Sequence, residues 1–320
     1  MIQQFFSYCL SPPISIGGLF YARPGYTLSD RVIIFQIRSL KRIRSTHLAG
    51  YCLQQLLRTL VHISSAPVPL RAMGQKKLQR FAELETFPNV LQYPTDMQGN
   101  WETIFHNQHP ITLELACGKG EYATGLGRMY PQRNYIGVDQ KGNRMWVGAR
   151  TCLHEQLTNV AFLRTQIDQI AAYFSSGEVS EIWITFPDPQ LRCSKHKKRL
   201  THPKYLRLYR QFLQEGGLIH LKTDSPVLYH FTKKVIELYG LTLHTDFENL
   251  YQQEILLPEW QIKTHYEALD IAGSNRIQYL CFSLTDSIND AEKDTILKQW
   301  VFESEQNSSE KERYRLKQNK

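Results

Sequence analysis

The sequence predicts an α/β protein built on a mostly parallel sheet of seven strands, with helices on both faces and an antiparallel strand at one edge. From about residue 111, short apolar runs rich in β-branched and aromatic residues alternate with amphipathic stretches. Strands and helices in alternation build a parallel sheet that is covered on both faces. The last two apolar runs are separated only by an irregular segment, about 248–275, which fits an antiparallel strand closing the sheet edge.

The positions of the predicted elements follow from the two periodicities of the apolar residues. The strands are expected at 111–117, 135–139, 160–165, 181–186, 218–223, 241–246 and 276–283. The helices are expected near 121–129, 143–157, 167–174, 203–214 and 226–239, the last of them beginning at a proline.

The N-terminal segment 1–72 has a composition unlike that of the rest. It contains eight Arg and Lys residues and one acid, Asp30, so most of the net charge of +8 lies in this segment. We predict that 1–72 is a non-native or disordered extension and that Met73 is the true start, with an organelle transit peptide as the alternative. A basic arm is expected at 73–110, the α/β domain at 111–285 and a charged C-terminal tail at 286–320.

Composition restricts the compartment and the metal chemistry. The six cysteines form no CxxC pair and no cluster with histidine, which argues against a zinc site and a disulfide scaffold, so no metal is expected. No apolar run reaches the length of a membrane helix, so no membrane partner is expected. We therefore predict a cytoplasmic protein. The sequence leaves both a monomer and a homodimer open.

A glycine turn follows the first predicted strand. Gly118 and Gly120 lie between this strand and the next helix, where the missing Cβ atoms let the backbone approach a ligand closely. Asp139 ends the second strand, and an acid in that position can accept hydrogen bonds from ribose hydroxyls. The segment 118–123 also satisfies the dinucleotide pattern GxGxxG/A, so an NAD oxidoreductase is an alternative.

Two acids near the turn favour a cofactor that carries no phosphate. Glu121 would place a carboxylate beside the pyrophosphate that a dinucleotide sets on the helix N-terminus. S-adenosylmethionine has no phosphate and bears a sulfonium cation, so Glu114 and Glu121 are both compatible with it. The alternative role of Glu121 is to complement the helix dipole. The turn thus indicates an adenosine cofactor and favours S-adenosylmethionine.

The fourth strand ends in Phe-Pro-Asp-Pro at 186–189, and a basic run follows at 192–199. Ligands of a parallel sheet bind beyond the carboxyl ends of its strands, so Asp188 is expected to face the cofactor cleft from a turn stiffened by prolines. A charge run is usually a solvated face, but this one directly follows the cleft acid, so we predict that it contacts phosphates. Its cations are Arg192, Lys195, Lys197, Lys198 and Arg199.

These motifs, in this order, resemble those of the bacterial tRNA (guanine-N(7)-)-methyltransferase family, which has the Rossmann-like class I methyltransferase fold. The resemblance extends over about 111–284, and the combination of Phe-Pro-Asp-Pro, the basic run and Lys-Thr-Asp at 222–224 is its most specific part. The matching motifs are Glu114 with the loop 118–120, the segments 135–139 and 186–189, the end of the basic run at 198–200, Gly216-Gly217 leading to 221–224, and Thr-His-Tyr-Glu at 264–267.

The resemblance implies that 111–285 is a methyltransferase domain that transfers a methyl group from S-adenosylmethionine to nitrogen 7 of a guanosine in the tRNA variable loop. Asp188 would serve both the cofactor and catalysis. The implied cofactor contacts are Glu114, Gly118, Gly120, Asp139, Gln166 and Asp188. The implied substrate contacts are Arg192, Asp224, Thr264 and Glu267, and RNA would contact Lys195, Lys197, Lys198 and Arg199. The sequence departs from the family pattern at Gln166, Gln190 and Arg192.

The chemistry suits this reaction, although other functions are alternatives. Nitrogen 7 of guanine has a free lone pair, so no proton must be removed and the alignment of the reacting atoms dominates. Asp224 could instead cap the helix that begins at 226. Besides the NAD oxidoreductase, the alternatives are another nucleic-acid or small-molecule methyltransferase and a non-catalytic RNA-binding relative.

Overall fold

The computed structural model describes residues 75–269 and 276–318. The chain divides into two units, Met1–Ala72 and Met73–Lys320, and all described residues belong to the second unit. The predicted N-terminal extension, 1–72, lies outside the described residues. Within the described ranges, no helix is both long enough and apolar enough to cross a membrane.

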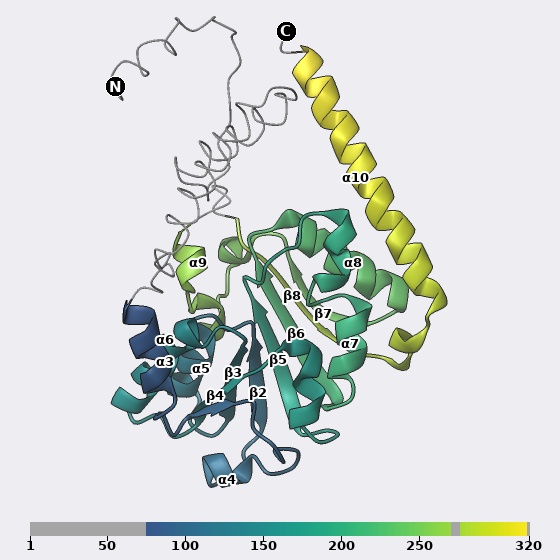
Figure 1. The fold of residues 1–320 in the computed structure, drawn as a ribbon. Helices are drawn as coiled ribbons and strands as arrows, with labels where there is room; N and C mark the ends of the chain where they lie inside the picture. The colour runs from purple at the N-terminus through teal and green to yellow at the C-terminus, as the bar shows by residue number, and fades with distance from the viewer. Residues whose placement is uncertain (1–74, 270–275, 319–320) are drawn as a thin grey trace, which may run out of the picture. The chain divides into compact units, whose positions relative to one another are not determined.

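The described chain forms one sheet of eight strands in the order β1-β4-β3-β2-β5-β6-β8-β7 (Figure 1). β8 runs antiparallel to both β6 and β7, and the other neighbours are parallel. The strands are β1 Val90–Gln92, β2 Ile111–Leu115, β3 Asn134–Asp139, β4 Val160–Arg164, β5 Val179–Thr185, β6 Leu213–Thr223, β7 Thr242–Phe247 and β8 Gln278–Ser283. The predicted fold class is therefore confirmed.

The predicted number of seven strands is wrong by one, because the arm at 73–110 contributes a strand. β1 pairs with β4 and extends the parallel edge of the sheet. β1 is only three residues long and half-buried, so it lacks the long alternation of apolar residues that identifies a strand in sequence.

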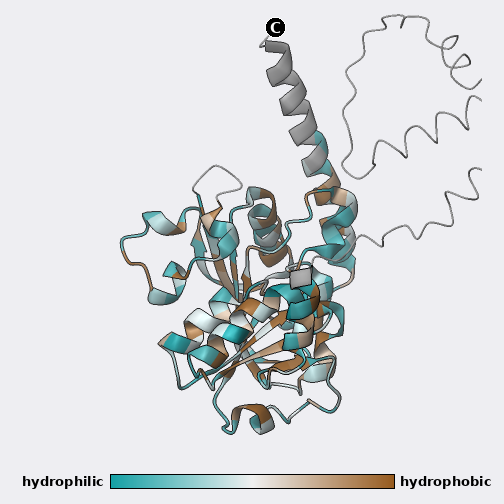
Figure 2. Ribbon diagram, turned by 60° about the vertical axis from the view of Figure 1, so that its left-hand side comes forward, coloured by the Kyte–Doolittle hydropathy of each residue, from teal (hydrophilic) through white to brown (hydrophobic). Residues whose placement is uncertain are grey.

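The helices cover both faces of the sheet, with α3, α5 and α6 on one face and α7, α8 and α10 on the other (Figure 1). The α-helices are α3 Gln75–Leu84, α4 Glu102–Phe105, α5 Glu121–Met129, α6 Gly142–His154, α7 Pro203–Tyr209, α8 Pro226–Tyr239, α9 His265–Ala268 and α10 Glu292–Gln318. The 3-10 helices are η1 Ile167–Tyr173, η2 Cys193–Lys198, η3 Leu250–Gln252, η4 Pro258–Gln261 and η5 Asp286–Asn289. Figure 2 shows the hydrophobic residues concentrated in the strands and in the sides of the helices that pack on them.

The predicted helix 203–214 is too long, since α7 ends at Tyr209 and β6 already begins at Leu213. The predicted bounds of α8, 226–239, are confirmed, and its caps show why. The Ser225 side chain accepts a hydrogen bond from the Leu228 amide, Pro226 occupies the first turn, and Gly240 ends the helix at φ 58°. The residue that caps α8 is therefore Ser225. The alternative role of Asp224 as the helix cap is wrong, since the cap lies one residue later.

The beginning of the predicted C-terminal tail belongs to the core. Leu297 and Val301 of α10 are buried, and α10 packs against α8. The Arg207 guanidinium donates two hydrogen bonds to the Asp294 carboxylate, at 2.9 and 2.7 Å. This segment looked like a tail because charged residues outnumber the few apolar residues that anchor it.

Replacing Leu297 by Ala is expected to destabilise the protein by about 2–5 kcal/mol, because the leucine side chain is fully buried and its loss leaves a cavity. The matched control is Ile296→Ala on the same helix, whose side chain is 52% exposed and whose loss should change the free energy of unfolding by less than about 1 kcal/mol. Urea unfolding measures both values. Equal effects of the two substitutions would show that α10 is not docked.

Candidate active site

The predicted site residues come from loops that leave one edge of the sheet. β3, β2, β5 and β6 are consecutive neighbours and run parallel, so their carboxyl ends meet at this edge. We call it the carboxyl edge. It carries the glycine turn after β2, Asp139 at the end of β3, the 186–199 loop after β5 and Asp224 after β6.

The glycine turn depends on a backbone conformation that disfavours side chains. Gly118 and Gly120 have φ values of 57° and 72°. A Cβ atom on Gly120 would lie 2.4 Å from Cε1 of Phe162, whereas a Cβ on Gly118 would meet nothing within 4 Å. Gly120 is therefore required by packing as well as by conformation, and the space beside Gly118 is open to a ligand.

Asp139 binds the glycine turn directly. Its carboxylate accepts hydrogen bonds from the amide of Gly118 at 2.9 Å and from the amide of Lys141 at 2.7 Å. Each oxygen retains a lone pair with which it can accept a further hydrogen bond. Gln166 is exposed one residue beyond Thr165, whose amide donates to the Asp139 carbonyl at 3.2 Å. The structure thus brings together the segments of Gly118, Asp139 and Gln166, which the family resemblance assigned to one cofactor.

Glu114 lies beneath the glycine turn. Its side chain is buried and accepts hydrogen bonds from the Ala123 amide at 2.8 Å and the Thr185 hydroxyl at 3.3 Å. Burial raises the pKa of the Glu114 carboxyl from 4.5 to about 8, and the nearby Glu121 adds to this rise. Glu114 therefore joins the start of α5 to the end of β5 and is placed to shape the turn from below.

Asp188 is exposed at the carboxyl edge, on a turn that carries backbone strain. Its carboxylate accepts a hydrogen bond from the Gln190 amide at 3.0 Å. Phe186 and Gln190 on either side have φ values of 46° and 47°, a region that non-glycine residues rarely adopt. Such conformations concentrate at functional sites, where the surrounding structure holds them. Leu115 pairs with Ile184, so the glycine turn and the Asp188 turn leave adjacent strands at matching positions.

The basic run divides into exposed and buried cations. Lys195, Lys197 and Lys198 on η2 are exposed, as is Arg192 before it. Arg199 is only 3% exposed. Its guanidinium donates to the carbonyls of Pro189 and Gln190, both at 3.2 Å, and lies 4.6 Å from the centre of the Phe231 ring. The predicted contact of Arg199 with RNA is therefore wrong, because this side chain is buried and holds the Asp188 turn in place.

Thr264 and Glu267 lie on the loop between β7 and β8, which contacts the first turn of α5. The buried Thr264 hydroxyl caps α9 by accepting a hydrogen bond from the Glu267 amide at 3.1 Å. Glu121 in the first turn of α5 accepts a hydrogen bond from the His265 amide at 3.3 Å. Both residues thus have structural roles that the sequence did not reveal, and Glu121 links their loop to the glycine turn.

Comparisons with known proteins also point to a methyltransferase. A family model described as "Putative methyltransferase" matches residues 108–278. The tRNA (guanine-N(7)-)-methyltransferase of Porphyromonas gingivalis is 48% identical over 217 residues, which cover 63% of this chain and 86% of that protein. The enzyme of the same name from Bacteroides thetaiotaomicron is 46% identical over 221 residues, with 66% and 87% covered. The chain belongs to the bacterial tRNA (guanine-N(7)-)-methyltransferase family.

One feature of this methyltransferase was not assigned a role from sequence. Lys222, in the middle of the Leu-Lys-Thr-Asp motif on β6, is completely buried. Its ammonium group donates hydrogen bonds to the Trp260 carbonyl at 2.9 Å, the Ile262 carbonyl at 3.0 Å and the Tyr251 hydroxyl at 3.1 Å. The available sequence signal was a lysine inside an otherwise apolar strand end, which requires a buried partner.

The partner of Lys222 is Glu267. The ammonium and the carboxylate are 3.0 Å apart, and the Tyr251 hydroxyl also donates to this carboxylate. The Lys222 ammonium lies 5.4 Å from the centre of the Tyr122 ring and 5.9 Å from that of Phe186. Burial lowers the pKa of Lys222 to about 8, against the opposing effect of the Glu267 charge. This pair fastens the 250–267 loop to β6 beneath the carboxyl edge.

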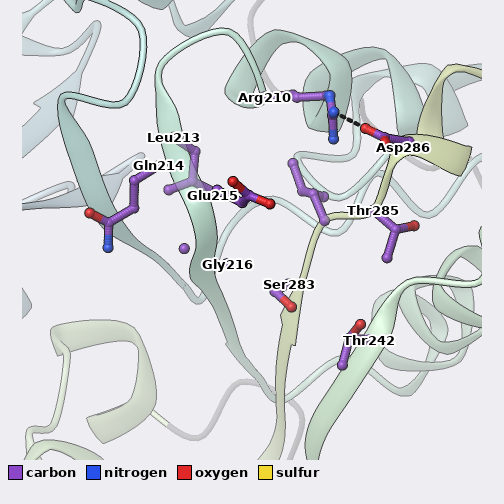
Figure 3. A pocket seen from close by; sticks show the side chains of 11 residues that line it. Arg210, Leu213, Gln214, Glu215, Gly216, Thr242, Ser283, Thr285 and Asp286 are labelled. Carbon is purple, nitrogen blue, oxygen red and sulfur yellow. Dashed lines mark hydrogen bonds and ion pairs between the residues drawn. The ribbon is translucent and has the colours of Figure 1, made fainter.

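A separate cavity of about 650 Å³ lies at the opposite edge of the sheet, where β6 begins (Figure 3). It is lined by residues 213–217 at the start of β6, by Thr242 and Ser283, and by an ion pair of Arg210 with Asp286. None of the predicted site residues lines it. Ligands of parallel sheets bind at carboxyl ends, so this cavity is not the active site. Among the described residues, no group of three or more His, Cys, Asp or Glu side chains is arranged to hold a metal ion.

Replacing Lys222 by Met is expected to destabilise the methyltransferase by about 3–5 kcal/mol, because Glu267 would remain buried without its countercharge. The double variant Lys222→Met, Glu267→Leu should recover most of this loss, since a buried ion pair can be replaced by apolar side chains. The control is Lys234→Met, which breaks the surface pair with Glu237 and should cost less than about 1 kcal/mol. Urea unfolding measures the free energy of unfolding of all three variants. A double variant no more stable than Lys222→Met would contradict the pairing of Lys222 with Glu267.

The stability of the wild type is expected to fall relative to that of Glu114→Gln as the pH rises from about 4.5 to about 8. The folded-state pKa lies above the ordinary value, so the folded protein binds the proton more tightly than the unfolded chain. This stabilisation is fully present below pH 4.5 and is lost as the pH rises through 8. Unfolding free energies measured across this range test the sign. Parallel profiles of the two proteins would mean that Glu114 is not held protonated by burial.

Proposed function

We propose that this protein transfers a methyl group from S-adenosylmethionine to nitrogen 7 of a guanosine in tRNA, as the names of its relatives state for them. The observation that supports this most directly is that the carboxyl edge brings together the glycine turn, Asp139, the exposed Asp188 and four exposed cations of the basic run. These residues lie in the part of the chain that matches the methyltransferase family model, 108–278.

The residues at the carboxyl edge fit S-adenosylmethionine. The open space beside Gly118 would take the adenosine, and the Asp139 carboxylate, with its remaining lone pairs, would accept hydrogen bonds from the ribose hydroxyls. Gln166 would contact the adenine with its amide. When bound, S-adenosylmethionine supplies an electrophilic methyl group on a positively charged sulfur. The Glu121 carboxylate near the turn suits that charge, whereas it would oppose a pyrophosphate.

Catalysis then rests on positioning rather than on proton removal. Nitrogen 7 of guanine already has a free lone pair, so the protein must hold the base in line at an approach distance of about 3 Å. Positive charge develops on the purine, and the fixed carboxylate of Asp188 would stabilise it there. Arg199 and the strained backbone at Phe186 and Gln190 keep this carboxylate in one place before the substrate arrives.

Recognition of guanine requires acceptors for its donor edge. Asp188 and Asp224 are both at least partly exposed at the carboxyl edge, and Asp224 is released from helix capping by Ser225. A carboxylate can accept hydrogen bonds from the N–H groups of guanine that adenine lacks. Thr264 and Glu267 would contribute indirectly, by fixing the loop that closes the site, because their side chains are engaged in the α9 cap and the Lys222 pair.

The guanosine lies within folded tRNA, in the variable loop by family resemblance, and must be turned outward at a cost of a few kcal/mol. Arg192, Lys195, Lys197 and Lys198 would offset this cost by contacting phosphates. A cytoplasmic location, where tRNA is modified, is part of the proposal. A non-catalytic RNA-binding relative is the remaining alternative, and it is disfavoured by the retained acids of the turn and of the Asp188 loop.

Asp188→Asn is expected to lower the rate of 7-methylguanosine formation by about 100-fold or more, because the charge that stabilises the purine is lost while the side chain keeps its shape. Affinity for tRNA, set by the basic run, should change little. The control is Asp286→Asn at the opposite edge of the sheet, which should methylate at the wild-type rate. Nucleoside mass spectrometry of treated tRNA measures the product. Full activity of Asp188→Asn would refute the catalytic role.

A further inference from the structure

The cations of the described chain differ in whether they have acidic partners. Most of those far from the carboxyl edge form ion pairs, as Arg128 does with Glu155, Arg207 with Asp294 and Lys233 with Asp246. The cations of the basic run at Arg192, Lys195, Lys197 and Lys198 have no acid within 4 Å in the described structure. A second group shares this property: Lys77 and Arg80 of α3, Lys141 before α6, and Arg144 and Arg150 of α6.

The second group lies on two helices that pack against each other, and we call these five residues the α3–α6 face. Arg80 and Arg150 lie 4.6 and 5.0 Å from the centre of the Trp146 ring, so three side chains from the two helices stack together. Lys77, Lys141 and Arg150 are exposed, and Arg80 and Arg144 are partly exposed. Stacking on an aromatic ring orders an arginine while leaving its N–H groups at the rim available as donors.

One residue of the α3–α6 face contacts the loop that carries Thr264 and Glu267. Arg144 lies 5.6 Å from the centre of the Tyr266 ring, in the loop that contains Thr264 and Glu267. α6 begins at the carboxyl end of β3, and Figure 1 shows α3, α6 and α9 on the same side of the sheet. The acid that touches this face, Glu83, is engaged, since it accepts hydrogen bonds from the Trp146 indole and the Gln79 amide, both at 2.8 Å.

The two unpaired groups flank the cofactor turn. The basic run follows β5 and α6 follows β3, while the glycine turn follows β2, which lies between those strands in the sheet. A substrate that reaches the glycine turn can therefore touch cations on both sides. An RNA arm is a ligand of this kind, because its phosphates are spaced along both strands.

We propose that the α3–α6 face is a second RNA-binding surface, which contacts the tRNA backbone on the opposite side of the cofactor turn from the basic run. The inference rests on the proposed function for the identity of the RNA. An unpaired, ordered arginine contributes more binding free energy to a phosphate contact than a paired arginine does, because no internal ion pair must be broken. Binding on both sides of the turn would hold the tRNA while the guanosine is turned toward Asp188.

The test compares two triple variants that remove the same charge. The first variant removes three positive charges from the α3–α6 face and carries Arg80→Gln, Arg144→Gln and Arg150→Gln. The second removes three positive charges from α8 and α10 and carries Lys233→Gln, Lys234→Gln and Lys298→Gln. We expect the first to weaken tRNA binding on the order of tenfold or more and to reduce the steepness of log affinity against log salt by about 2–3. The second should bind as the wild type does. Fluorescence anisotropy with labelled tRNA at several salt concentrations measures both quantities.

Unchanged affinity and slope in the first variant, or equal losses in both variants, would overturn the proposal. Calorimetric titration with S-adenosylmethionine checks that each variant is folded. If the triple variant does not fold, the single substitution Arg150→Gln of an exposed residue replaces it, with an expected slope change of about 1. Formation of 7-methylguanosine by the wild type is scored separately. Its absence would refute the proposed function, whereas binding results alone decide the role of the α3–α6 face.

Discussion

The positions of the loops at the carboxyl edge depend on one buried charge, the ammonium group of Lys222. Four hydrogen-bond and ion-pair contacts join it to a loop of short 3-10 and α-helical turns, and the rings of Tyr122 and Phe186 lie on its other sides. A buried cation tolerates few alternative arrangements, since each lost partner leaves a desolvated charge. The pair with Glu267 therefore holds the 250–267 loop, the start of α5 and the end of β5 in a single relative position.

The Asp188 turn is held by a comparable arrangement nearby. Phe186 and Gln190 occupy left-handed backbone conformations, which cost free energy unless the surroundings impose them. The buried Arg199 supplies that constraint through two backbone carbonyls. The Asp188 carboxylate is thus exposed on a constrained backbone, which is what the proposed stabilisation of a developing charge requires.

The distribution of charge carries more information than its total. The net charge of +8 comes mainly from 1–72, so it says little about the described domain. Within that domain, the pairing of cations with acids leaves unpaired positive charge on both sides of the glycine turn. Which cations are paired depends on contacts between residues far apart in the chain, as with Arg207 and Asp294.

From residue 111 onward, the sequence by itself determined the order of the main strands and helices, the glycine turn, and the placement of Asp139 and Asp188 after strands. Those features depend on local periodicity and on backbone conformations that few residue types adopt. Only the tertiary structure decided that Arg199 is buried, that Glu267 pairs with Lys222 and that the arm adds a strand. A side chain with a charged end and an apolar stem suits either solvent or a buried partner, and its fate depends on which distant residue the fold brings beside it.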